Sequence, residues 1–211
     1  MCYPCLRYAS ALPDLPRNRG EELRGHTLIL AYGPAHFPQS MPAAPNDLFA
    51  FLDKLGIAHP TITHPPVFTV EEAKRLRGEI TGEHTKNLFL KDKRGAVFLV
   101  TALEHAAIDL KTLHHRLGAA RFSFGPADLL RELLGVEPGA VTPFGVINDT
   151  GRRVTVVLDA AMMEHDPLNY HPLVNTMTTS IRRDDLVAFL RTTGHEPRIL
   201  AVSGDPAPAT A

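Results

Sequence analysis

Regular spacing of hydrophobic and polar positions begins only at Met41. Residues 1–40 carry scattered prolines and no sustained apolar period, apart from the stretch at 27–30. Short amphipathic runs then continue to about residue 202, and a Pro/Ala-rich stretch closes the sequence. We therefore expect a poorly structured extension over 1–40, which an over-long gene start would also explain. A folded domain over 41–202 and a flexible tail over 203–211 complete the expected organisation.

Helical periodicity and end signals predict the helices. Asn46 has the side chain of an N-cap for a helix over 47–55, and Gly56 follows as its C-terminal stop. Thr69 opens a capping box for a second helix to about Leu76. Further helices are predicted at 108–117, 126–134 and 183–192, with a short one at 159–163.

Alternating apolar positions predict strands, some of which pair as hairpins. Residues 86–91 and 96–101 flank the charged turn 92–95, and residues 144–148 and 153–158 flank a second turn at 149–151. Extended segments are also predicted at 59–64, 170–180 and 197–202. Hairpins mixed with helices indicate a single α+β domain with a mainly antiparallel mixed sheet packed by helices.

Composition limits the classes of protein that fit. The chain has 211 residues, 44% of them hydrophobic, which allows one sizeable core rather than two full domains. A formal net charge of -1 argues against a general polyanion binder, so a nucleic-acid ligand would be held by a local patch. No run of about 18 apolar residues occurs, and we expect no membrane span. The only cysteines, Cys2 and Cys5, suit a reducing cytoplasm.

Familiar catalytic motifs are absent from the sequence. It contains no G-x-S-x-G nucleophile elbow, no phosphate-cradling G-x-x-x-x-G-K-S/T loop and no H-E-x-x-H zinc motif. Cys2 and Cys5 form one C-x-x-C with no second pair. His114 and His115 are adjacent and would face about 100° apart on a helix, which makes them poor partners for one ion. We expect neither a metal nor an organic cofactor.

A lysine and an asparagine open the strand predicted at 86–91. Period-2 alternation places Lys86 on the same face as Leu88 and Leu90. Asn87 then shares the other face with Phe89 and Lys91. The ammonium group of Lys86 would lie at the end of an apolar row, where a pocket has room to open.

Two later segments also carry candidate chemistry. Residues 139–143 fit a loop between the helix at 126–134 and the strand at 144–148, in which Gly139 supplies a positive φ and Pro143 a stiff exit. His171 precedes a proline and is therefore expected in an extended stretch.

Three segments together resemble the YbaK/prolyl-tRNA synthetase-associated editing domain family. They are Thr85-Lys86-Asn87-Leu88-Phe89-Leu90-Lys91-Asp92, Gly139-Ala140-Val141-Thr142-Pro143 and Tyr170-His171-Pro172-Leu173-Val174-Asn175-Thr176. Among the free-standing members, the chain is most similar to the deacylases that remove alanine from proline tRNA. The resemblance covers about residues 45–202. It implies cofactor-free ester hydrolysis in the cytoplasm, in which the free ribose hydroxyl next to the ester assists.

The resemblance also implies roles for individual residues. Lys86, Asn87 and Gly139 would be catalytic, with Lys86 holding the phosphate–ribose end of the acceptor strand. Gly139, Thr142, Pro143 and His171 would bind the aminoacyl group, the loop through its backbone N–H groups and His171 as a pocket wall.

Nucleic-acid contacts and partners follow from the same resemblance. Lys86, Lys91 and Arg121 would contact the tRNA. The implied partners are the acceptor end of tRNA(Pro) carrying a misacylated amino acid and, as a second partner, prolyl-tRNA synthetase. Two alternatives stay open: a cysteinyl-tRNA(Pro) deacylase, and a catalytically silent accessory module that binds tRNA or a synthetase.

Overall fold

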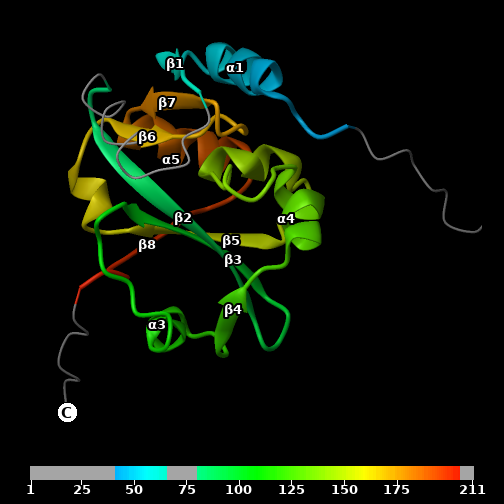
Figure 1. Cartoon of the computed structure of the whole chain (residues 1–211), viewed down its shortest axis with the longest axis vertical. Coiled ribbons are helices and arrows are strands. Elements are labelled where there is room, and N and C mark those ends of the chain that lie inside the picture. The colour runs from blue at the N-terminus through cyan, green and yellow to red at the C-terminus, as the bar shows by residue number, and fades with distance from the viewer. Residues whose placement is uncertain (1–40, 66–79, 205–211) are drawn as a thin grey trace, which may run out of the picture. The chain divides into compact units, whose positions relative to one another are not determined.

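Three strands form the centre of the fold: β2 (Glu83–Asp92), β3 (Val97–Leu103) and β5 (Val154–Asp159) (Figure 1). The computed structural model describes residues 41–65 and 80–204, which belong to one compact unit, Ser40–Ala211. The predictions for residues 1–40, for the helix from Thr69 to Leu76 and for most of the tail fall outside the described residues.

The described strands form one eight-stranded mixed sheet in the order β1-β7-β6-β2-β3-β5-β8, with β4 paired to β2. The outer strands are β1 (Thr61–Thr63), β4 (Phe122–Phe124), β6 (Leu168–Tyr170), β7 (Met177–Ile181) and β8 (Arg198–Leu200). The pairs β2–β3, β2–β4, β6–β7 and β1–β7 are antiparallel, whereas β2–β6, β3–β5 and β5–β8 are parallel. The predicted α+β class with a mixed sheet is confirmed.

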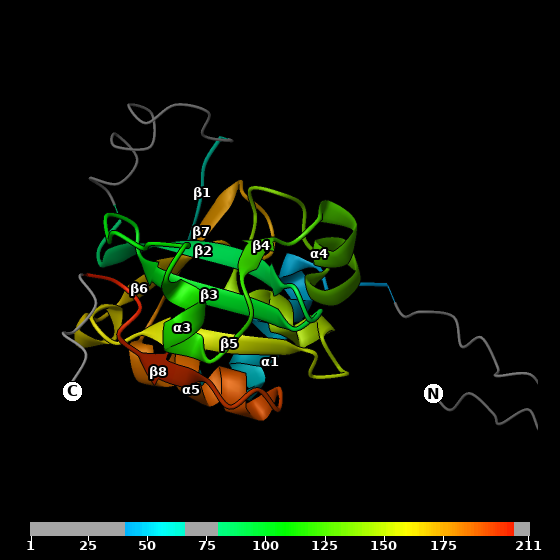
Figure 2. The same ribbon diagram turned by 90° about the horizontal axis from the view of Figure 1, so that it is seen from below.

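Helices cover both faces of the central strands. Helices α1 (Pro45–Lys54), α4 (Ala127–Leu134) and α5 (Arg183–Thr192) pack on one face, and α3 (Leu113–Leu117) packs on the other (Figures 1 and 2). Two 3-10 helices, η1 (Pro143–Asn148) and η2 (Met162–Glu164), complete the described elements.

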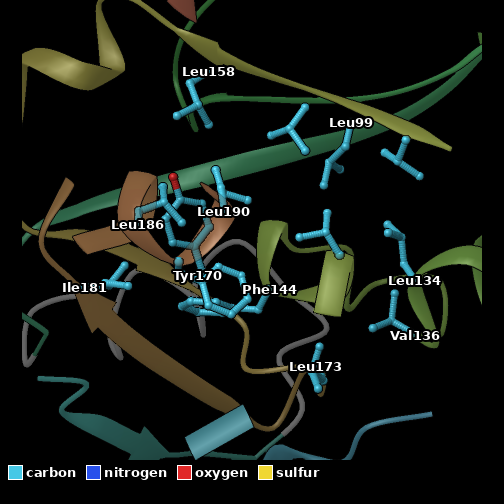
Figure 3. Packing of buried hydrophobic residues seen from close by; sticks show 14 of the residues in the cluster. Leu99, Leu134, Val136, Phe144, Leu158, Tyr170, Leu173, Ile181, Leu186 and Leu190 are labelled. Carbon is cyan, nitrogen blue, oxygen red and sulfur yellow. The ribbon is translucent and has the colours of Figure 1, made fainter. Parts of the chain in front are cut away.

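Alternation along β2 divides the core into two clusters. Phe89 belongs to the larger cluster, of which Figure 3 shows other members such as Leu134 and Phe144, whereas Leu90 belongs to the smaller cluster with Leu113 of α3. The predicted facing of these side chains is therefore confirmed. Their burial stabilises the strand between two layers by about 25 cal/mol for each Å² of apolar surface removed from water.

The strand predicted at 144–148 is wrong, and so is the hairpin that it would form with β5. The segment is the 3-10 helix η1, and Thr142 caps it by accepting a hydrogen bond from Phe144 N at 3.3 Å. The side chain of Asn148 donates to Leu134 O at 2.8 Å and accepts from Ala43 N at 2.7 Å. Side-chain contacts thus anchor a segment that a strand ladder would otherwise hold. Strand β5 pairs in parallel with β3 instead.

Other element boundaries also differ from the prediction. Helix α3 lacks residues 108–112, because the Asp109 carboxylate accepts hydrogen bonds from Lys111 N at 2.9 Å and Thr112 Oγ1 at 3.0 Å and fixes a turn there. Helix α1 starts at Pro45 after Ala44, so Asn46 is not the N-cap. The short helix predicted at 159–163 lies later, as η2, and strand β4 was not predicted.

Candidate functional site

Neighbouring residues of β2 direct their side chains to opposite sides of the sheet. Lys86 donates a hydrogen bond from Nζ to the carbonyl oxygen of Ala106, in the loop after β3. Asn87 donates from Nδ2 to the carbonyl oxygen of Val141 at 3.0 Å, in the loop before η1. Two of the predicted catalytic residues therefore contact different segments of the chain.

The amide of Asn87 has a fixed orientation and one unused acceptor. A carbonyl oxygen can only accept, so the nitrogen of the amide must face Val141. The remaining atom, Oδ1, is buried and has no hydrogen-bond donor among the described residues. A buried acceptor left without a donor typically costs about 1–3 kcal/mol. A bound ammonium or hydroxyl group would satisfy it.

The loop from Gly139 to Pro143 presents unused backbone donors beside Asn87. Ala140 N donates to Glu137 O at 2.9 Å, whereas the N–H groups of Val141 and Thr142 donate to no other described residue. Gly139 has φ +93°, a left-handed conformation that side chains rarely adopt. A Cβ built there would lie 3.8 Å from Asn175 Nδ2, so the conformation, and not a lack of space, demands glycine.

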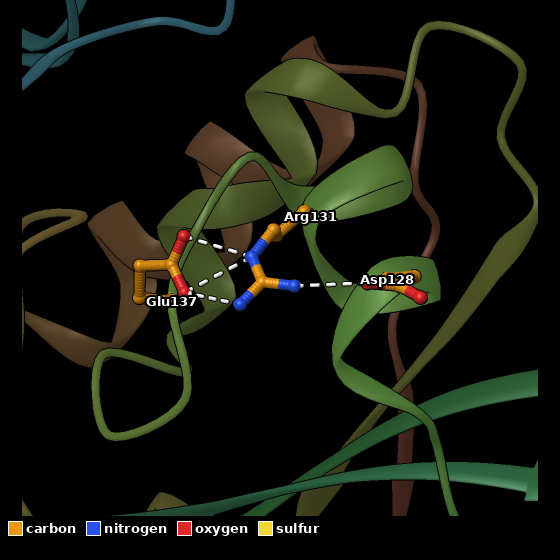
Figure 4. Close-up of polar contacts among 3 residues, drawn as sticks. All are labelled: Asp128, Arg131 and Glu137. Carbon is orange, nitrogen blue, oxygen red and sulfur yellow. Dashed lines mark hydrogen bonds and ion pairs between the residues drawn. The ribbon is translucent and has the colours of Figure 1, made fainter.

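An ion-pair network anchors the start of this loop to α4 (Figure 4). Arg131 Nε lies 2.8 Å and 3.0 Å from the two carboxylate oxygens of Glu137, and Nη1 lies 2.9 Å from Asp128 Oδ1. The hydrogen bond from Arg131 lowers the pKa of Glu137 below its usual value. Glu137 also accepts the turn hydrogen bond from Ala140, so the ion pair and the turn fix the same residue.

Thr142 and Pro143 fix the exit of the loop. Both are buried, and Pro143 occupies the first turn of η1, where its missing N–H leaves no bond unmade. The hydroxyl of Thr142 is engaged with Phe144 N. Because neither side chain is available, these two residues could contact a substrate only through the backbone of the loop or by setting its shape. Their substrate contacts stay a prediction.

His171 lies at the start of the loop that joins β6 to β7 and holds its ring in one tautomer. Its Nδ1 lies 2.9 Å from Met177 O, and because a carbonyl only accepts, Nδ1 carries the proton. In the neutral ring, Nε2 is then an acceptor, and within residues 41–65 and 80–204 no donor bonds to it. Burial lowers the pKa of His171 below its ordinary value, and the nearby His64 lowers it further, whereas the bond to Met177 opposes the shift.

His64 is the residue near the site that the sequence prediction missed. Its ring centroid lies 6.4 Å from that of His171, and its Nε2 lies 2.9 Å from Thr178 Oγ1 on β7. His64 N also donates to Thr176 O at 2.9 Å. The available signal was the His-Pro dipeptide that His64 shares with His171, although it did not single out His64, because His59 also precedes a proline.

The structure brings some of the predicted residues together and separates others. Asn87 contacts the Gly139–Pro143 loop through Val141, and the loop approaches Asn175 in the segment that also carries His171. Lys86 lies on the other face of β2. Lys91 is half-buried on the face of Asn87, and Arg121 is exposed beyond the far end of the strand.

Within residues 41–65 and 80–204, no group of three or more His, Cys, Asp or Glu side chains is placed to hold a metal ion. No helix in this part of the chain is both long and apolar enough to cross a membrane.

Comparison with known proteins places this arrangement in a family. The family model described as the aminoacyl-tRNA editing domain matches residues 64–189. A zebrafish (Danio rerio) protein named prolyl-tRNA synthetase associated domain-containing protein 1 is 42% identical over 157 residues, 74% of this chain and 85% of its own. The prolyl-tRNA editing protein ProX of Acetoanaerobium sticklandii is 37% identical over 149 residues, 70% of this chain and 91% of its own.

A solved structure supports the fold. The crystal structure of a proposed trans-editing enzyme for prolyl tRNA synthetase superposes with a TM-score of 0.59 and 19% sequence identity. The superposition covers 77% of this chain and 97% of that one. The residues that the family model matches contain β2, the Gly139–Pro143 loop and His171, which are the segments that form the site. This chain belongs to the aminoacyl-tRNA editing domain family.

Proposed function

We propose that this protein is a trans-editing deacylase that hydrolyses alanine wrongly attached to proline tRNA. Membership of the editing domain family supports ester hydrolysis on an aminoacyl-tRNA, and the similarity to ProX supports proline tRNA as the carrier. The reaction takes place in the cytoplasm, where protein synthesis supplies both the substrate and prolyl-tRNA synthetase as a partner.

The unsatisfied Oδ1 of Asn87 beside the Gly139–Pro143 loop carries the proposal. An aminoacyl ester presents an α-ammonium group, which donates, and a carbonyl oxygen, which gains negative charge during attack. Asn87 supplies a buried acceptor for the first group. The N–H group of the half-buried Val141, which donates to no other described residue, supplies a donor for the second, and the fully buried N–H of Thr142, equally without a partner among these residues, lies next to it. Preorganised donors of this kind usually contribute more to acyl-transfer catalysis than any other effect, and loss of one lowers kcat by about 10²–10³.

Water is the nucleophile, and the substrate itself helps to activate it. The hydroxyl of Ser203 donates to Asp159 Oδ2 at 2.6 Å, but Ser203 follows β8 and belongs to none of the three site segments. The terminal ribose, in contrast, has a free hydroxyl next to the ester. This hydroxyl assists attack of a water molecule on the carbonyl carbon. The ester C–O bond then breaks, the amino acid keeps the water oxygen, and the ribose oxygen takes a proton. In this proposal His171 Nε2 accepts a hydrogen bond from the substrate, and Lys86 releases Ala106 O to hold the phosphate–ribose end from the other face of β2.

Alanine is an expected error of a synthetase that selects proline. A synthetase pocket that accepts proline cannot strongly reject alanine, because each missing methylene changes the binding free energy by only about 1–3 kcal/mol. A second site that admits alanine and excludes the pyrrolidine ring supplies the missing discrimination. The stiff exit at Pro143 and the left-handed Gly139 give the loop one fixed shape for this purpose.

Multiple-turnover hydrolysis tests the proposal. Purified protein at a small fraction of the concentration of alanyl-tRNA(Pro) should release all of the alanine at a rate proportional to enzyme. Binding of the tRNA without release of alanine would assign the protein to the accessory modules. If it released no alanine but released cysteine from cysteinyl-tRNA(Pro) in a parallel assay, it would be a cysteinyl-tRNA(Pro) deacylase.

A further inference from the structure

A cleft lies at the end of β2 that is remote from the Asn87–Val141 contact. It has a volume of about 360 Å³ and is lined by Leu110, Lys111, Arg121 and Phe122. Ligand pockets commonly have volumes of about 300–1,000 Å³. Phe122 pairs with Asp92 across β2 and β4, so the cleft lies five residues, or about 17 Å of strand, beyond Asn87.

The apolar wall of the cleft is a rigid aromatic surface. The ring of Phe122 meets the buried ring of Phe98 edge to face, with 5.1 Å between centroids and 71° between planes. Phe124, two residues later and on the same face of β4, is 64% exposed. Aromatic side chains held in this way are sequence-tolerant platforms for nucleobases, because every base has a π-face.

The polar wall of the cleft is cationic. The charged groups of Lys111 and Arg121 form no ion pair or hydrogen bond with any other described residue. Asp109 is the neighbouring carboxylate; its hydrogen bonds from Lys111 N and Thr112 Oγ1, and then the charges of Lys111 and Arg116, lower its pKa, so it offsets part of the Lys111 charge without forming an ion pair with it. Arg116 is occupied by the carbonyl oxygens of residues 201, 203 and 204. Two cations that form no ion pair within residues 41–65 and 80–204 therefore flank Phe122 in a chain of net charge -1.

We propose that this cleft binds one unpaired nucleotide of the RNA substrate, with the base over Phe122 and the phosphate between Lys111 and Arg121. The inference rests on the proposed function for the identity of the RNA and adds a second contact point to it. A nucleotide combines the flat apolar ring and the anion that the two walls require. Such a contact binds the RNA without touching the ester, so it affects binding of the tRNA and not the chemical step.

A single tryptophan reports on the cleft directly. The chain contains no tryptophan, so Phe122→Trp introduces the only indole, and a nucleobase stacked on it quenches its fluorescence. Phe49→Trp, on the partly buried face of α1, is the matched control. We expect a short single-stranded RNA to quench Phe122→Trp in a saturable manner and to leave Phe49→Trp unchanged. Absence of quenching at RNA concentrations that saturate the binding of labelled tRNA would overturn the proposal.

A second experiment measures RNA binding after one cation of the cleft is removed. Arg121→Gln alters an exposed side chain and should weaken binding of the same RNA at least about fivefold. Lys54→Gln, which removes an exposed lysine on α1, should leave binding unchanged. Equal binding by both variants would overturn the site. If the protein hydrolyses alanyl-tRNA(Pro) but RNA does not quench the fluorescence of Phe122→Trp, the nucleotide site is refuted and the proposed function stands. If RNA quenches this fluorescence but the protein does not hydrolyse alanyl-tRNA(Pro), the proposed function is refuted and the nucleotide site stands.

Discussion

The side-chain nitrogen of Asn87 lies 3.0 Å from the backbone oxygen of Val141 and joins strand β2 to the loop before η1. This contact does two things at once. It positions a loop whose N–H groups have no other described partner, and it leaves the oxygen of the same amide buried without a donor. The pair is therefore both the structural link between two segments and the part of the site with an unmet hydrogen-bonding requirement.

Replacing Asn87 with aspartate should abolish this link while preserving its shape. In Asn87→Asp, a carboxylate oxygen faces the Val141 carbonyl, so two acceptors meet and no hydrogen bond forms. We expect at least a tenfold loss of kcat and a loss of about 1–3 kcal/mol in the free energy of unfolding. Chemical denaturation and single-turnover deacylation measure the two effects. The control Asn46→Asp, on the exposed side of α1, should change neither, and normal activity of Asn87→Asp would remove Asn87 from the site.

Gly139→Ala tests whether the shape of the loop matters. Alanine at φ +93° is strained, which we expect to lower the free energy of unfolding by about 1–2 kcal/mol. Gly118→Ala is a matched control, because Gly118 has φ +67° and open space around its Cβ position, at the C-terminus of α3. Both variants should lose similar stability, but only Gly139→Ala should lower kcat. An equal effect of the two on deacylation would mean that the loop conformation serves folding alone.

The pH dependence of the site should follow His171. Burial lowers its pKa in the folded protein below the value of about 6.5 in the unfolded chain. Below pH 6.5 the unfolded state binds more protons, so stability falls as the pH falls toward the folded pKa. The neutral ring with its free Nε2 persists through the same range, and the acid limb of kcat/KM should therefore lie below about pH 6.5. His171→Gln should remove that limb, whereas the exposed His105→Gln should keep it. An acid limb at higher pH would contradict this role.

Lys86→Ala should lower hydrolysis of alanyl-tRNA(Pro) at least about tenfold, which corresponds to about 1.4 kcal/mol of transition-state stabilisation. In the structure without substrate the ammonium group is held by Ala106 O, on the face of β2 away from Asn87. A role in hydrolysis therefore requires the RNA to reach both faces of the strand. Lys86→Arg, which keeps the charge, should retain more activity than Lys86→Ala. Activity near that of the unchanged protein in a folded Lys86→Ala variant would remove Lys86 from the reaction.

The alternation of side chains along a strand predicted the central part of the fold. It succeeded there because β2 and β3 are buried on both faces, which leaves little freedom in how the two strands align. The residues of β2 and β3 alternate between the two cores as their spacing indicates, and a one-residue slip would exchange Phe89 with Leu90. The same reasoning failed at 144–148, where Thr142 and Asn148 satisfy backbone groups locally. The Thr142 cap spans only two residues, but Asn148 accepts from Ala43 N across 105 residues, and no short window of sequence contains that contact.

The candidate site was predictable as a set of segments and less so as a geometry. The motifs around Asn87, Gly139 and His171 identify three pieces of chain, and the structure brings these pieces together. Strand alternation alone predicts that Lys86 and Asn87 point to opposite faces. The segment that each side chain contacts depends on which loop covers each face, and the sequence does not give this. The contribution of His64 depends on the pairing of β1 with β7, which sequence spacing alone does not give.

The specificity of deacylation is tested most directly with proline tRNA carrying alanine, cysteine, serine or proline, measured in parallel with one enzyme preparation. We predict that kcat/KM for alanine exceeds each of the others at least about tenfold and that prolyl-tRNA(Pro) stays intact, because the proposed function requires the pocket beside the Gly139–Pro143 loop to admit a methyl group and to exclude a pyrrolidine ring. Faster release of cysteine, or hydrolysis of the proline ester at a comparable rate, would contradict the proposed specificity. Failure to release any of these amino acids would contradict the assignment of this protein as an editing enzyme.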